Sequence, residues 1–192
     1  MWQLDWSKLA EVLTYDPSQP MIFNSGLFLF LFLGFSLVYA LLQKKTTARL
    51  LFVTAFSYYF YYKSSGIYFF LLGIVTVSDF LLARQMAHTV AHWKRKFLVV
   101  VSLCINLGLL CYFKYTNFFY EMLCPLWNGS FEPLDIFLPV GISFFTFQSL
   151  SYTLDVYRGD LKPLSSLLDY AFYVSFFPQL VAGPIVRARD FV

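Results

Sequence analysis

Long apolar runs separated by short charged loops dominate this sequence. The first run, from Ile22 to Leu42, is almost unbroken, and a transmembrane helix needs roughly 20 such residues. Charged residues make up 13% of the chain, about half of the ~25% found in soluble domains. The 24 phenylalanines and 14 tyrosines exceed what a soluble core of this size can hide. We therefore predict an all-α fold, a polytopic transmembrane helix bundle.

Five more apolar segments are expected to complete the bundle within one transmembrane domain, residues 21–192. The six predicted spans lie near residues 22–42, 50–62, 67–82, 97–113, 136–154 and 164–181. The last two of these spans contain or are followed by proline and glycine, which predicts broken or re-entrant helices. Such helices occur within lipid only where protein or water covers the backbone. Residues 1–20 are interpreted as a separate interfacial helix, because Trp2, Trp6 and Leu9 share one amphipathic face.

The loop charges predict an orientation for the first four spans. Residues 43–49 and 84–96 are basic, whereas the N-terminal segment and residues 121–135 are acidic. Because cytoplasmic loops are enriched in Lys and Arg, the N-terminus is expected outside the cytoplasm of a cell inner membrane. Beyond residue 136 the charges are mixed and predict no side. The net charge of +3 is too small to indicate nucleic-acid binding.

Two histidines and three cysteines are weak candidates for chemistry. His88 and His92 have the i, i+4 spacing of some metal sites but no further ligands nearby. We interpret them as members of a solvated basic loop and predict no metal site. The cysteines form no paired motif, so we interpret them as small apolar residues.

Asp79 and Lys114 are charged groups at the edges of apolar spans. A charge there must pair or face water. For Asp79 we favour a partnered structural role over a proton relay. For Lys114 we favour snorkelling or stacking against Phe113 and Tyr115.

The segment from Ser143 to Asp155 is the most polar part of any predicted span. Seven polar side chains fall within these 13 residues: Ser143, Thr146, Gln148, Ser149, Ser151, Thr153 and Asp155. Hydrocarbon offers them no hydrogen bonds. They either line a polar cavity or bind neighbouring helices together, and the sequence supports both interpretations equally.

Two late runs resemble a known family. The run Leu138–Gln148 with its continuation Asp155–Gly159, and the run Phe176–Arg187, resemble the membrane-bound O-acyltransferase family, in particular its bacterial alginate O-acetyltransferase branch. Weaker similarities lie at Phe23–Ser25 and Tyr112–Asn117.

This resemblance implies an enzyme that transfers an acyl group, often acetyl, to a hydroxyl of an extracytoplasmic polysaccharide such as an alginate-like polymer. It implies no tightly bound cofactor, an acyl donor such as acetyl-CoA, and a secreted or membrane-tethered partner protein. The residues that we expect to line the substrate channel are Ser143, Thr146, Gln148, Ser151, Asp155, Arg158 and Gln179.

One family feature has no counterpart in the sequence. The family's catalytic histidine follows the run that ends at Arg187, and neither His88 nor His92 matches its position. We therefore assign no catalytic residue and expect the chain to be the amino-terminal portion of such an enzyme, inactive alone. The alternatives are a non-catalytic polytopic scaffold or pore, or D-alanyl transfer to teichoic acid within the same family.

Overall fold

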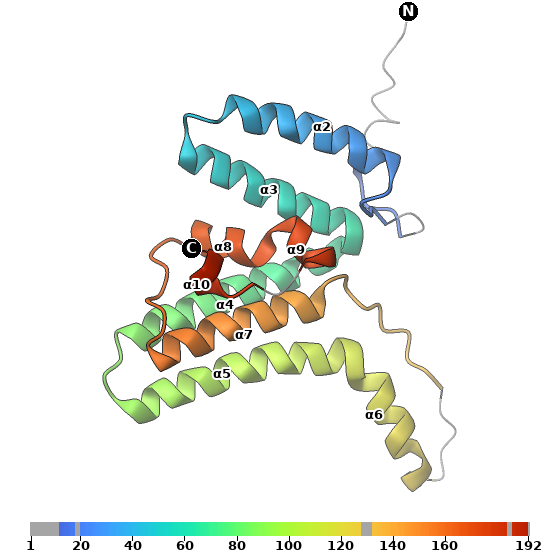
Figure 1. The fold of residues 1–192 in the computed structure, drawn as a ribbon. Coiled ribbons are helices and arrows are strands. Elements are labelled where there is room, and N and C mark those ends of the chain that lie inside the picture. The colour runs from blue at the N-terminus through green and yellow to red at the C-terminus, as the bar shows by residue number, and fades with distance from the viewer. Residues whose placement is uncertain (1–11, 18–19, 128–131, 184–185, 192) are drawn as a thin grey trace, which may run out of the picture.

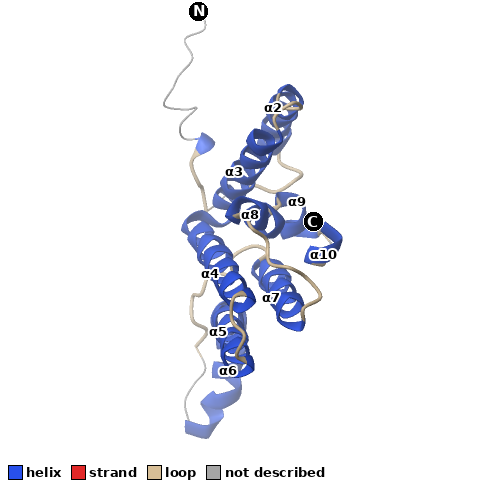
Figure 2. Ribbon diagram, turned by 90° about the vertical axis from the view of Figure 1, so that its left-hand side faces the viewer, coloured by secondary structure: helices blue, strands red, loops and turns tan. Residues whose placement is uncertain are grey.

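The computed structural model of the chain contains helices and no strands within the residues that it describes (Figure 2). These residues are 12–17, 20–127, 132–183 and 186–191. The predicted all-α fold is therefore confirmed. Most of the expected interfacial helix over residues 1–20 lies outside the described residues.

The helices keep the order of the apolar runs. They are α2 (Gly26–Leu41), α3 (Thr46–Ser65), α4 (Phe69–Ala87), α5 (His92–Leu110), α6 (Thr116–Leu123), α7 (Ile142–Arg158), α8 (Leu167–Ser175), α9 (Phe177–Ala182) and α10 (Ala188–Phe191). A 3₁₀ turn at Gly66–Tyr68 joins α3 to α4, a π-helical turn at Cys111–Tyr115 joins α5 to α6, and a 3₁₀ turn at Cys124–Trp127 follows α6.

Helix α7 lies between α4 and α5 in the bundle (Figure 1). Helices α4 and α5 both contact α7, and α8 contacts α3 and α4. Figure 1 shows α2 and α3 as an antiparallel hairpin on one side of α8 and α9, with α4, α7 and α5 on the other side. The polar segment of the sequence is therefore surrounded by helices.

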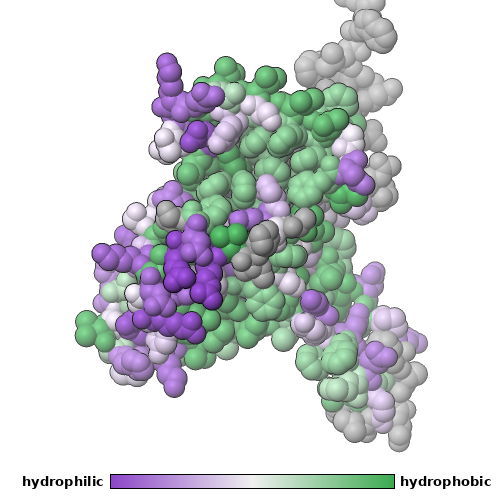
Figure 3. All heavy atoms as spheres, viewed as in Figure 1, coloured by the Kyte–Doolittle hydropathy of each residue, from purple (hydrophilic) through white to green (hydrophobic). Residues whose placement is uncertain are grey.

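The outer surface has the character of a membrane protein. The continuous helical stretches Thr46–Ala87 and His92–Leu123 are long and apolar enough to cross a bilayer, and α2 and the stretch Leu167–Val181 are shorter apolar segments. No residue of α2 is buried, although most of its 16 residues are Phe, Leu or Val. Figure 3 shows apolar side chains across much of the visible face. Such a surface is suited to lipid and not to water.

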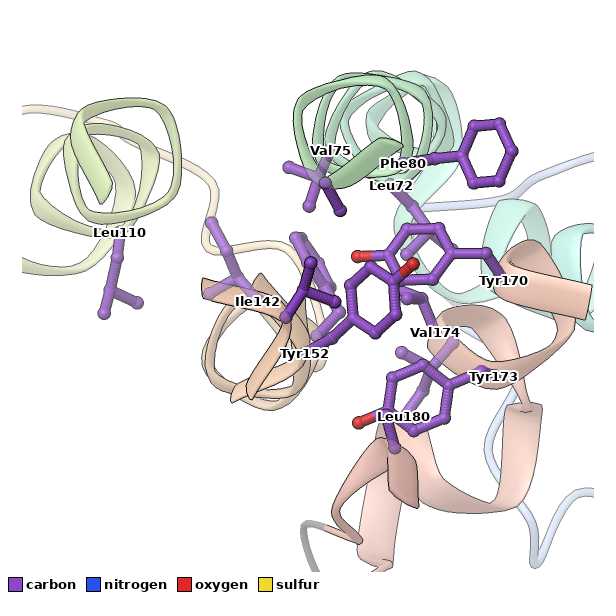
Figure 4. Close-up of a cluster of buried hydrophobic side chains, with 14 of the residues drawn as sticks. Leu72, Val75, Phe80, Leu110, Ile142, Tyr152, Tyr170, Tyr173, Val174 and Leu180 are labelled. Carbon is purple, nitrogen blue, oxygen red and sulfur yellow. The ribbon is translucent and has the colours of Figure 1, made fainter. Parts of the chain in front are cut away.

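Two clusters form the core. The larger one joins α4, α5, α7 and α8, and in Figure 4 the rings of Tyr152, Tyr170 and Tyr173 gather between α7 and α8. The smaller one holds Met21, Phe60 and Phe177 against the aromatic rings of α2 and α3.

A break in the last apolar segment lets one residue reach the smaller cluster. Helix α8 ends at Ser175, Phe176 is extended with φ −54° and ψ 108°, and Pro178 occupies the first turn of α9. Phe177 then places its ring 5.3 Å from that of Phe56 and 5.6 Å from that of Phe60, measured between ring centres. The broken helix predicted for this region is thus observed.

A glycine allows α7 to begin against α9. Gly141 has φ +73°, and a Cβ added to it would lie 2.3 Å from the Leu180 carbonyl oxygen. This position therefore needs glycine both for its left-handed backbone and for the close approach of α9.

We expect Gly141→Ala to lower the stability of the purified chain by more than about 2 kcal/mol, because left-handed backbone alone costs about 1–2 kcal/mol for a residue with a Cβ. Chemical unfolding in detergent measures the change. Gly108→Ala is the matched control, since a Cβ there meets nothing within 4 Å. Equal stability of the two variants would contradict this account of the α7–α9 contact.

Candidate functional site

Gln148 lies at the centre of a polar contact between three helices. Its side chain is 3% exposed. Its Nε2 donates to the Tyr173 carbonyl oxygen at 2.7 Å and to Gln179 Oε1 at 3.0 Å. The Tyr173 carbonyl is accessible because Phe177, which would bond to it in a continuous helix, donates its N–H to Ser57 Oγ at 3.3 Å instead. The break between α8 and α9 therefore creates the acceptor that Gln148 uses.

Two hydroxyl groups adjoin this contact. Tyr173 donates its hydroxyl to the Val186 carbonyl oxygen at 3.0 Å, and Ser151 Oγ donates to the Gln148 carbonyl oxygen at 2.9 Å. The two hydroxyl oxygens are 3.5 Å apart. We call Gln148, Ser151, Tyr173 and Gln179 the Gln148 cluster. It combines amide and hydroxyl groups that can both donate and accept hydrogen bonds.

Two further predicted residues have polar atoms without partners. Asp155, one turn after Ser151, is 8% exposed, and its Oδ2 has no hydrogen-bond partner among the described residues. The Oγ1 of Thr146, whose side chain is fully buried, also has none. An unpaired buried polar group typically costs about 1–3 kcal/mol, so both atoms are suited to accept a hydrogen bond from a ligand.

The structure does not bring Ser143 and Arg158 to this cluster. They lie at opposite ends of α7, about 22 Å apart at the usual rise per residue. Ser143 Oγ is 3.4 Å from Lys114 Nζ, and both line a separate cavity of about 260 Å³ at the start of α7. Arg158 is exposed. Lys114 also lies over the Tyr115 ring at 5.5 Å, as the stacking interpretation expects.

The histidines lie elsewhere. His88 is exposed and lines a cavity with Arg84 and Ser165, and His92 Nε2 is 3.4 Å from the Tyr157 hydroxyl near the end of α7. Within the described ranges, no three His, Cys, Asp or Glu side chains are grouped closely enough to hold a metal ion.

The sequence singled out Asp79 but not the polar group that surrounds it. Asp79 is fully buried and is hydrogen-bonded to Ser102 and Asn106 of α5. It is partnered, as interpreted, but it lies in the interior of the bundle. Its partners are 23 and 27 positions away, so no local motif could have indicated them. Tyr173 was missed because it is one of many aromatic residues in an apolar run.

Fold and site together define a helical membrane protein whose buried polar groups converge on one central helix. No family model and no solved structure matches the chain. Among curated proteins it is 34% identical over 177 residues to the probable alginate O-acetylase AlgI of Pseudomonas aeruginosa, and 38% identical over 177 residues to that of Azotobacter vinelandii. It is 34% identical over 211 residues to the peptidoglycan O-acetyltransferase of Helicobacter pylori.

These alignments cover 90%, 90% and 95% of the chain, and 34%, 35% and 40% of the relatives. The chain thus spans little more than a third of the length of the relatives that it matches. Over nearly its whole length it is similar to these O-acetyltransferases, and the resemblance drawn from its motifs is confirmed.

Gln148→Ala is expected to destabilise the purified chain by about 1–3 kcal/mol, because the Tyr173 carbonyl and Gln179 amide lose their shared donor while buried. Gln85→Ala serves as the control on the exposed surface of α4, where a change within about 0.5 kcal/mol is expected. Unfolding in detergent compares them. A Gln148→Ala variant as stable as the control would show that the contact does not join the helices.

Proposed function

We propose that the chain is part of an enzyme that transfers an acetyl group to a hydroxyl of an extracytoplasmic polysaccharide. Its similarity to alginate and peptidoglycan O-acetyltransferases carries this proposal. Both named acceptors are glycans, so we assign a sugar hydroxyl as the acceptor class and an alginate-like polymer as one example. Acetyl-CoA is the proposed donor, and a secreted or membrane-tethered protein is the proposed partner.

The chemistry of the Gln148 cluster supports this assignment. Acyl transfer to a hydroxyl needs hydrogen-bonding groups in a space from which water is excluded, since water competes for the acyl group. The side-chain amides of Gln148 and Gln179 and the hydroxyls of Ser151 and Tyr173 are such groups. We propose that this cluster, with the unpaired oxygens of Thr146 and Asp155, binds and orients the reactants.

We further propose that the 192 residues alone do not catalyse the transfer. Removal of the proton from an acceptor hydroxyl near neutral pH is best performed by a group such as histidine within hydrogen-bond reach. His88 is exposed, and His92 lies beside Tyr157, near the end of α7. The side chains of the Gln148 cluster itself are amides and hydroxyls. Such groups can bind reactants, but they are weak bases.

The proposed location is the cell inner membrane, with the N-terminus outside the cytoplasm. The connection between α4 and α5 supports it: Arg84, Lys94, Arg95 and Lys96 flank this turn, and cytoplasmic ends of membrane helices are enriched in such residues.

A chimaera tests the proposed function. The 177 residues of the Azotobacter vinelandii relative that align with this chain would be replaced by it, and the acetyl content of alginate measured in cells without their own O-acetylase. We expect acetylation by the chimaera and none by the 192-residue chain.

In the chimaera, the double substitution Gln148→Ala and Asp155→Ala is expected to lower acetylation at least tenfold, because losing about 1.4 kcal/mol of binding corresponds to a factor of ten. Gln85→Ala should leave it unchanged, with membrane levels matched by immunoblot. Acetylation by the isolated chain, or full activity of the double variant, would refute the proposed role.

A further inference from the structure

Asp79 is a carboxyl group that the chain encloses without help from any other molecule. Its side chain is 0% exposed and projects from α4. Ser102 Oγ lies 2.6 Å from Oδ1, and Asn106 Nδ2 donates to Oδ2 at 2.7 Å. Both partners lie on α5 and are themselves 0% exposed. Among the described residues, the Oδ1 of Asn106 is the one side-chain oxygen of these three residues without a hydrogen-bond partner.

Hydroxyl groups of α7 and α8 extend the site on its other side. Thr153 Oγ1 lies 3.4 Å from Ser102 Oγ. Ser149 interacts with the Asp79 carboxyl and accepts a hydrogen bond from Tyr170 at 3.2 Å. Three neighbouring helices therefore contribute polar atoms, and all of those atoms are uncharged.

Among the described residues, no basic side chain forms an ion pair with Asp79. The ion pair found within the described ranges joins Arg189 to Asp190 at the surface. Arg95, two turns before Ser102 on α5, donates instead to the carbonyl oxygens of Val156 and Tyr157 at 3.3 and 2.7 Å.

The titratable side chains that face the carboxyl are tyrosines. They are Tyr152 of α7 and Tyr170 of α8, while α5 presents Ser102 and Asn106. A tyrosine near neutral pH is uncharged. The site therefore has one formal negative charge when Asp79 is ionised and none when it is protonated.

An isolated buried charge is expensive. Removing one ion from water costs several kcal/mol even after the protein relaxes, and intramembrane carboxyl groups normally pair or face water. Asp79 does neither. Binding of a small cation would remove this cost, and the 2.6 Å separation between its Oδ1 and Ser102 Oγ is that of a hydrogen bond between a hydroxyl and a carboxyl group.

We propose that Asp79 is a buried proton-binding site and is a neutral carboxylic acid at neutral pH. Its hydroxyl donates to Ser102 Oγ, Ser102 donates its single hydroxyl hydrogen to Thr153 Oγ1, and Asn106 donates to the second carboxyl oxygen. This arrangement accounts for the contacts of Asp79 with Ser102 and Asn106 and places no net charge in the core.

The inference goes beyond the proposed acyl transfer because it concerns a different face of α7. Thr153 and Ser149 face Asp79, whereas Gln148 faces α8 and α9. Loss of the proton would leave a charge where α4, α5 and α7 meet. The bound proton therefore favours the packed arrangement of these helices. Its binding requires neither an acyl donor nor an acceptor.

Infrared spectroscopy of the full chain in lipid nanodiscs tests the proposal. Wild-type protein labelled with ¹³C-carboxyl aspartate should show the carbonyl stretch of a protonated carboxyl group at neutral pH. We expect Asp79→Asn to lose this band and Asp155→Asn, the matched buried carboxyl, to retain it. Absence of any protonated carboxyl band that depends on Asp79 would overturn the assignment.

Two further measurements keep the result decisive. If Asp79→Asn does not fold, Ser102→Ala should shift the band, because the carboxyl hydroxyl loses its acceptor. Thermal unfolding at constant ionic strength should be the same in sodium, potassium and choline chloride. Stabilisation by one metal ion that disappears in Asp79→Asn would identify a metal-ion site and refute the proton. Neither readout involves acetyl transfer, so their failure is separable from failure of the proposed function.

Discussion

Inside a lipid-embedded bundle no water is available to hydrogen-bond a buried polar group, so that group must bond to another part of the protein. This constraint organises the molecule. Helix α7 meets it on two faces. Ser149 and Thr153 turn toward the Asp79 carboxyl, while Gln148 and Ser151 turn toward α8 and α9. Through these two faces the most polar segment of the chain contacts α4, α5, α8 and α9.

The break between α8 and α9 frees a backbone hydrogen-bond acceptor that a regular helix would use internally. A continuous helix bonds its own carbonyls internally, so it offers few acceptors to a neighbour. The extended Phe176 leaves the Tyr173 carbonyl to Gln148 and directs the Phe177 ring into the aromatic cluster of α2 and α3. One local departure from helical geometry therefore supports both a polar contact and an apolar one.

The sequence predicted those features that depend on local pattern. Apolar runs indicated helices, and proline with glycine indicated the breaks. The start of α7 was placed six residues early, because Pro139 and the left-handed Gly141 hold the preceding stretch out of the helix. The pairs Gln148–Gln179 and Asp79–Asn106 join positions 31 and 27 apart. Their meeting depends on how helices pack, which a single sequence does not encode in any fixed spacing.

The contact between Gly141 and Leu180 has a mechanical consequence. Backbone pressed directly on backbone leaves no side chain to deform, so α9 cannot slide along the start of α7 without carrying it along. The loop that leads into α7 is bound in turn to α3 by the Val140–Ser65 hydrogen bond of 3.0 Å. A force applied to α9 would therefore reach the hairpin of α2 and α3 as a rigid displacement.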